Sequence, residues 1–165
     1  MKRGAETTRD RPAGGPIVVI DSSVAIKWLV EEDDSATALR LLEAWETGRV
    51  SPVAPAWIDV EVGNILWKKA RRNEITHPEA SEHLKDFLGL EFSRVPADAL
   101  LPAALDLALR FGTSVYDSLY LALSERESRP FVTADERLVN AVTPALPGPV
   151  TLADWAAARP APPAA

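Results

Sequence analysis

The stretch IVVIDSSV, residues 17–24, decides how the rest of this chain is interpreted. Its four apolar residues, Ile17 to Ile20, are typical of a short strand buried on both faces of a parallel sheet. Asp21 follows directly, and a helix is predicted from Ser22 to Val30. A buried strand that leads into a helix is the first half of a βαβ unit. The stretch therefore predicts an α/β domain with Asp21 at the carboxyl end of its first strand.

The same alternation of extended and helical segments continues along the chain. Extended segments are predicted at 50–54 (broken by Pro52 and Pro55), 92–95, 131–133 and 150–152. Helices are predicted at 35–47, 57–72, 78–88, 97–111, 115–127 and 135–142. Short strands separated by helices favour a central parallel sheet flanked by helices. In such sheets ligands bind outside the carboxyl ends of the strands, so the functional residues are expected there.

Length and composition limit the possible classes of protein. The 165 residues suggest one domain at 17–158, with a disordered leader at 1–16 and a disordered Pro/Ala tail at 159–165. Hydrophobic residues make up 47% and charged residues 25%, which excludes disorder of the whole chain. The absence of cysteine excludes disulfides and thiolate sites, and it is consistent with a cytoplasmic location. No apolar run reaches the roughly 18 residues of a membrane span, so no membrane partner is expected.

Two acidic residues lie just past predicted strands, and two lie on helices that look buried. Asp21 follows IVVI, and Asp135 comes two residues after FVT (131–133). Asp117 is the only charge in VYDSLYLAL (115–123), a segment that is apolar or small on nearly every side. Glu61 shares a helix face with Trp57, Ile58 and Ile65. An ionised carboxylate on a core-facing stripe is costly unless it is paired or bound to a cation.

Each acid also has a structural explanation. Asp21 before Ser-Ser is a favoured helix N-cap. Ser114 with Asp117, and Thr133 with Glu136, have capping-box spacing. Glu61 could lie at the edge of its apolar stripe and reach solvent. The four acids together nevertheless indicate a cation site more strongly than any one of them does. Four carboxylates at one sheet edge would repel one another unless a cation neutralised them.

The ligand types in this set select the cation. With no cysteine, and with His77 and His83 six residues apart, the candidate ligands are all hard oxygens. Such ligands favour Mg²⁺ or Mn²⁺ over zinc. A carboxylate site for these ions usually serves phosphate chemistry.

Four motifs together resemble the PIN domain family, and within it the small VapC-type ribonuclease toxins of bacterial toxin–antitoxin pairs. They are VIDSSV (19–24), PAWIDVEVGNIL (55–66), SVYDSLYLALS (114–124) and FVTADERL (131–138). The resemblance spans about Ile17 to Leu152. It implies a Rossmann-like fold and a Mg²⁺- or Mn²⁺-dependent endoribonuclease that inhibits translation. It also implies an RNA substrate, a cognate antitoxin protein as partner, and a homodimer.

The resemblance also assigns roles to individual residues. The family's four acids correspond to Asp21, Glu61, Asp117 and Asp135, as metal ligands and catalytic residues. Supporting roles, in orienting ligands or water, fall to Ser23, Asn64 and Thr133.

Two other functions remain open at this level. In an aspartate-based phosphoryl-transfer domain, such as a phosphatase or receiver domain, Asp21 would be the nucleophile. Phosphatases of that kind place a second acid two residues later, where this chain has Ser23. In a catalytically silent protein-binding module, the carboxylates would serve only as helix caps.

Overall fold

The computed structural model describes residues 14–159 and contains one sheet of five parallel strands. Along the sheet the order is β3-β2-β1-β4-β5. The strands are β1 (Ile17–Ile20), β2 (Ser51–Pro55), β3 (Ser93–Val95), β4 (Phe131–Thr133) and β5 (Pro149–Thr151). The chain builds outward from β1 on one side, through β2 and β3, and then on the other, through β4 and β5. The predicted α/β class is confirmed, and the crevice between β1 and β4 is the point where the strand order reverses.

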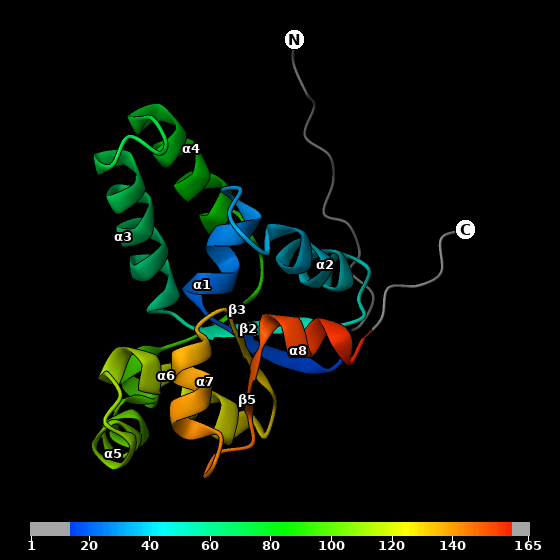
Figure 1. The fold of residues 1–165 in the computed structure, drawn as a ribbon, viewed down its shortest axis with the longest axis vertical. Helices are drawn as coiled ribbons and strands as arrows, with labels where there is room; N and C mark the ends of the chain where they lie inside the picture. Colours follow the sequence, from blue (N-terminus) through cyan, green and yellow to red (C-terminus); the bar gives the residue numbers. More distant parts are fainter. Residues whose placement is uncertain (1–13, 160–165) are drawn as a thin grey trace.

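Helices cover both faces of this sheet (Figure 1). They are α1 (Ser22–Ala25), α2 (Ser35–Glu46), α3 (Ile58–Arg71), α4 (His77–Leu88), α5 (Leu101–Phe111), α6 (Val115–Glu127), α7 (Glu136–Val142) and α8 (Leu152–Ala157). In Figure 1, α5 and α6 lie below the strands and α2 lies above them, while α3 and α4 project upward as a pair. Within residues 14–159, none of the helices has the length and apolar character needed to cross a membrane.

Helix α6 is the central helix of the fold. Its residues from Ser118 to Ser124 are all buried, and the helix contacts β1, β2 and β4. The first turn differs, because Tyr116 is 55% exposed and Asp117 is half-buried. The expected burial of residues 115–123 is therefore confirmed from Ser118 onward and is wrong for the first turn. The exposed first turn contains the charged residue.

Strand β2 is continuous despite its two prolines, which the sequence analysis expected to break it. Proline lacks the N–H that a strand residue donates to its neighbour. Ser51 N donates to Pro16 O on the β1 side, and Ala56 N donates to Val95 O on the β3 side.

Because successive residues of a strand face opposite neighbours, the nitrogen of Pro52 faces β3, whose pairing begins only opposite Val53. The nitrogen of Pro55 faces β1, whose pairing ends at Val53. Neither proline removes a sheet hydrogen bond.

Two of the predicted helices are divided in the structure, and one helix was not predicted. The helix expected at 22–30 is α1 followed by a 3₁₀ turn at Ile26–Trp28. The helix expected at 97–111 is a 3₁₀ turn at Ala97–Ala99 followed by α5, because Pro102 cannot donate to the preceding turn. Helix α8 was not predicted. Its signal was Thr151 three residues before Asp154, since the Thr151 hydroxyl accepts a hydrogen bond from Asp154 N at 3.0 Å.

The chain ends lie largely beyond the described residues. The leader predicted at 1–16 falls outside them up to residue 13, and the tail predicted at 159–165 falls outside them from residue 160. Gly15 is described, and its N–H donates to Gly48 O at 3.0 Å.

Candidate active site

Asp21 lies where the sequence analysis placed it, directly after β1, and it is 7% exposed. One carboxylate oxygen accepts hydrogen bonds from Ser23 Oγ at 2.6 Å and from Val24 N at 3.2 Å. The second bond makes Asp21 the N-cap of α1, so the capping interpretation is also correct. Burial raises the pKa of Asp21 from 3.8 to about 6, although these hydrogen bonds oppose the rise.

Two hydroxyl groups connect Asp21 to β4. Thr133 Oγ1 donates to the other carboxylate oxygen of Asp21 at 2.5 Å and accepts from Asp135 N at 2.9 Å. Ser23 Oγ donates to Asp21 and accepts from Ala134 N at 2.9 Å. Thr133 is fully buried. Since each hydroxyl both donates and accepts, the network holds the carboxyl ends of β1 and β4 together and fixes the orientation of the Asp21 carboxylate.

Glu61 is half-buried on α3 and accepts a hydrogen bond from the phenol of Tyr120 on α6. The Tyr120 ring is buried and stacks on Phe131 of β4, with 5.6 Å between ring centroids. Burial raises the pKa of Glu61 to about 7; the Tyr120 hydrogen bond opposes the rise, and the charges of Asp21 and Asp117 add to it. Glu61 is therefore turned inward rather than out to solvent.

Asp117 belongs to the exposed first turn of α6. Its backbone N–H donates to Ser114 Oγ at 3.0 Å, and Ser114 Oγ donates to the Asp117 carboxylate at 2.7 Å. The predicted cap is present, with both bonds made to the Ser114 hydroxyl. Burial and the adjacent Glu61 raise the pKa of Tyr120, and the charges of Asp21 and Asp117 add to this rise as they do for Glu61. The structure thus brings Asp21, Glu61 and Asp117 into one electrostatic cluster.

Asp135 and Asn64 lie on the solvent side of this cluster. Asp135 is exposed and caps α7, with its carboxylate accepting from Arg137 N at 3.0 Å and from Leu138 N at 3.1 Å. The box expected between Thr133 and Glu136 is therefore replaced by a cap from Asp135 itself. Its backbone N–H bonds to Thr133 Oγ1, which connects Asp135 indirectly to Asp21. Asn64 is exposed on α3, and within residues 14–159 its side chain makes no hydrogen bond.

The donor set meets part of what a divalent cation requires. The cluster offers only carboxylate and hydroxyl oxygens, which suit Mg²⁺ or Mn²⁺. Burial raises the pKa values of Asp21 and Glu61, the charges of Asp21 and Asp117 raise that of Glu61 further, and a cation would relieve this cost. In the described part of the chain, however, no three Asp, Glu or His side chains stand close enough to enclose an ion as they are. The carboxylates of Asp21, Glu61 and Asp117 instead bond to hydroxyl groups.

Sequence reasoning missed the partner that positions Glu61. Tyr120 was noted only as a neighbour of Asp117, whereas the pairing of Ser114 with Asp117 was predicted correctly. The available signal for Tyr120 was helical spacing, because it lies one turn after Tyr116 on the same face of α6. Nothing in the local sequence paired Tyr120 with Glu61, which lies 59 residues away.

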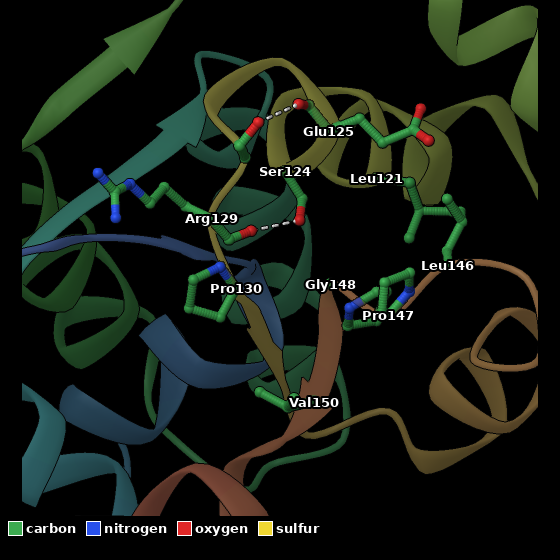
Figure 2. Close-up of a pocket in the computed structure, with 11 residues that line it drawn as sticks. Leu121, Ser124, Glu125, Arg129, Pro130, Leu146, Pro147, Gly148 and Val150 are labelled. Carbon is green, nitrogen blue, oxygen red and sulfur yellow. Dashed lines mark hydrogen bonds between the residues drawn. The ribbon is translucent and has the colours of Figure 1, made fainter.

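A separate cavity of about 520 Å³ lies at the opposite, amino ends of β4 and β5 (Figure 2). Its walls include Leu121, Leu146 and Pro147, with Gly148 facing Ser124. A Cβ atom at Gly148 would lie 2.6 Å from Ser124 Oγ, so a larger residue there would have to displace this hydroxyl, which donates to Arg129 O. The cavity is mostly apolar and contains none of the candidate site residues.

The chain is similar to proteins of known family. The PIN domain family model matches residues 18–142. Ribonuclease VapC3 of Pyrobaculum aerophilum is 32% identical over 127 residues, which cover 74% of this chain and 92% of the relative.

Among solved structures, VapC20 of Mycobacterium tuberculosis, described as a sarcin-ricin loop cleaving toxin, has a TM-score of 0.59 at 15% identity. The match covers 76% of this chain and 95% of VapC20. A toxin–antitoxin complex from Klebsiella pneumoniae contains a chain with a TM-score of 0.52 at 16% identity, and this match covers 82% and 97% of the two chains.

Proposed function

Because this chain belongs to the PIN domain family, and within it to the VapC ribonucleases, we propose that it is a metal-dependent endoribonuclease that hydrolyses RNA phosphodiester bonds. The observation that carries this proposal is the cluster of Asp21, Glu61 and Asp117. These acids come from three different elements, and the charges of Asp21 and Asp117 add to the rise in the pKa of Glu61 that burial causes. A purely structural role would require only three separate caps.

The cation is Mg²⁺ or Mn²⁺ in this proposal. PIN-domain ribonucleases generally depend on a metal ion. When bound, the ion supplies positive charge that polarises the phosphoryl group and favours an attacking hydroxide. Asp21, Glu61 and Asp117 would hold it, and Asp135 would complete the set from the solvent side. No side chain needs to act as a covalent nucleophile.

The surrounding side chains keep the acids in position. Ser23 and Thr133 donate to both oxygens of Asp21, which restricts rotation of that carboxylate. Tyr120 directs Glu61 toward the cluster, and Ser114 holds Asp117. Asn64, exposed three residues after Glu61 on the same helix, would orient water or substrate.

The partners follow from the same family membership. A structural relative comes from a toxin–antitoxin complex, which supports an antitoxin protein as a partner of this chain. We propose in addition an RNA substrate, a homodimer, and action in the cytoplasm as the translation-inhibiting toxin of its pair.

Of the alternatives, phosphoryl transfer to Asp21 is disfavoured, because both oxygens of that carboxylate already accept hydrogen bonds and the family is one of nucleases. A catalytically silent binding module is the second candidate function. It is favoured by one specific observation, that Asp21 and Asp135 are helix N-caps and that Asp117 bonds to Ser114, the N-cap of α6.

The deciding experiment is cleavage of a mixed RNA pool by the purified chain with Mg²⁺, with Mn²⁺ or with EDTA. Asp117→Asn should abolish cutting and leave the fold intact. Asp106→Asn, an equal charge change on the exposed side of α5, should cut as the wild type does. Cutting at the wild-type rate by Asp117→Asn would overturn the assignment. A folded wild type that cuts no RNA and binds no divalent ion by calorimetry would favour the binding module.

A further inference from the structure

Two aromatic rings stack beside the candidate active site. Trp57, directly before α3, and Tyr116, in the first turn of α6, lie with ring centroids 5.1 Å apart and planes 8° from parallel. Trp57 is half-buried, whereas Tyr116 is 55% exposed. The stack thus links the starts of two helices that are far apart in the sequence. More than half of the Tyr116 side chain remains open to solvent.

The stack is in register with the carboxylate cluster. Trp57 and Glu61 are four residues apart, as are Tyr116 and Tyr120, so each pair shares one face of its helix. Trp57 contacts Tyr116, and one turn further along both helices Glu61 accepts a hydrogen bond from Tyr120. A four-residue step rises about 6 Å along an α-helix. The exposed ring is therefore held about one helical turn from Glu61.

A structural role explains only part of this arrangement. Half-burial of Trp57 and the stack itself would staple α3 to α6, and an aliphatic pair would do the same. A staple gives no reason for an aromatic ring to stay 55% exposed at the edge of a carboxylate cluster. Exposed aromatic faces are what single-stranded RNA binds by stacking of its bases, with little dependence on sequence.

The negative net charge of the chain favours an affinity for RNA that comes from contacts other than those with the RNA backbone. The chain carries a net charge of −6, and the cluster beside the stack is acidic, so neither attracts an RNA backbone by itself. Base stacking supplies affinity without positive charge. We propose that the Trp57–Tyr116 stack is a platform for a nucleobase, which stacks on the exposed Tyr116 ring and sets the neighbouring phosphate at the carboxylates. This inference rests on the proposed nuclease function and specifies how that site takes its substrate.

The test compares steady-state cleavage of one single-stranded RNA oligonucleotide, containing a bond that the wild type cuts, by three variants. Tyr116→Leu removes the ring and keeps an apolar side chain, and its KM should rise on the order of 10-fold. Tyr116→Phe keeps the ring and should retain the wild-type KM. Trp67→Leu removes another exposed aromatic residue of α3, 52% exposed and beyond the site, and it should change neither KM nor kcat.

Abasic substrates test the contact between a nucleobase and Tyr116. In two further oligonucleotides, the nucleotide on one or the other side of the cut bond is abasic. For one of these abasic oligonucleotides, the KM of the wild type should rise on the order of 10-fold. The KM of Tyr116→Leu should not rise further, because the base stack that the abasic site removes is already absent in this variant. Urea unfolding of each variant verifies that the fold is retained.

The outcomes separate the two proposals. A wild type that cleaves RNA beside a Tyr116→Leu variant with unchanged KM overturns the platform and leaves the nuclease intact. A Tyr116→Leu variant that loses activity only by dissociating, as seen by sedimentation, also overturns the platform and makes the aromatic pair a protein interface. A wild type that cleaves no RNA overturns both proposals.

Discussion

Replacing Asp21 with asparagine should make the metal-free protein more stable at high pH. The pKa of Asp21 is raised from 3.8 to about 6 because its carboxylate is buried. Between these two values the folded chain binds a proton that the unfolded chain has released. Stability therefore falls as pH rises through this window, and the loss is complete above pH 6. Asparagine carries no charge and does not have this cost.

The magnitude follows from the shift. About two pKa units, at 1.36 kcal/mol each, correspond to about 3 kcal/mol of destabilisation at pH 8. At pH 5 the same carboxyl group costs about 1.6 kcal/mol, because the unfolded chain is then ionised and the folded one is mostly protonated. Ser23 and Thr133 form weaker hydrogen bonds with the neutral amide of Asp21→Asn than with the carboxyl group. This reduces the stability advantage of the variant over the wild type by about 1 kcal/mol at both pH values. Because this reduction is the same at both pH values, it cancels when they are compared. The advantage of the variant should therefore be about 1.4 kcal/mol larger at pH 8 than at pH 5.

The assay is urea unfolding followed by tryptophan fluorescence, with EDTA, at pH 5 and at pH 8. The advantage of Asp21→Asn over the wild type should grow by about 1.4 kcal/mol from the lower to the higher pH. Asp106→Asn, the exposed charge control, should stay within about 0.5 kcal/mol of the wild type at both. Replacing EDTA with millimolar Mg²⁺ should stabilise the wild type and leave Asp21→Asn unchanged, since only the former holds the ion.

Two results would refute this reasoning. An advantage of Asp21→Asn that is the same at pH 5 and pH 8 would mean that burial does not perturb this carboxyl group. Equal stabilisation of both proteins by Mg²⁺ would mean that the ion binds elsewhere.

Three further predictions concern the side chains around Asp21 and Glu61. Tyr120→Phe should fit the buried ring position and raise the pKa of Glu61 above about 7, because the lost hydrogen bond lowers it; carboxyl NMR titration measures this, and an unchanged pKa contradicts it. Thr133→Val should cost about 2 kcal/mol in urea unfolding, because it removes the partner of one Asp21 carboxylate oxygen and of the Asp135 N–H, whereas Thr133→Ser should cost less than half of that. Asp135→Ala should lose about 1 kcal/mol of stability because it removes the N-cap of α7, whereas Asp135→Asn should keep this cap. If Asp135→Asn binds Mg²⁺ more weakly in calorimetry, Asp135 is a metal ligand; if binding is unchanged, Asp135 serves only as a cap.

Several features of the site could be predicted because they depend on neighbouring residues. A run of four apolar residues followed by Asp21 places a carboxylate at the carboxyl end of a buried strand, whatever the rest of the chain does. The caps formed by Asp21 and Ser114 each accept from a backbone N–H three residues on, so spacing reveals them. The absence of cysteine limits the candidate ligands to oxygen.

Where local reasoning was wrong, packing was the cause. The prolines of β2 were expected to break the strand, and they do not, because β1 and β3 pair with different stretches of it. Helix α6 was expected to be buried over residues 115–123, and its first turn is not, since Tyr116 is exposed and Asp117 only half-buried. Pattern alone carries neither the extent of the neighbouring strands nor the edge of the sheet.

By itself, then, the sequence determined the α/β class, the position of Asp21 at the end of a strand, and the chemistry of the oxygen ligands. The tertiary structure decided which residues meet. The bond from Thr133 to Asp21 spans 112 residues, and that from Tyr120 to Glu61 spans 59. These contacts exist because the strand order sets β4 beside β1 and because α6 packs across both strands. Periodicity and propensity describe each element separately, whereas burial of one shared core fixes how the elements lie against one another, and so which acids influence one another's charge.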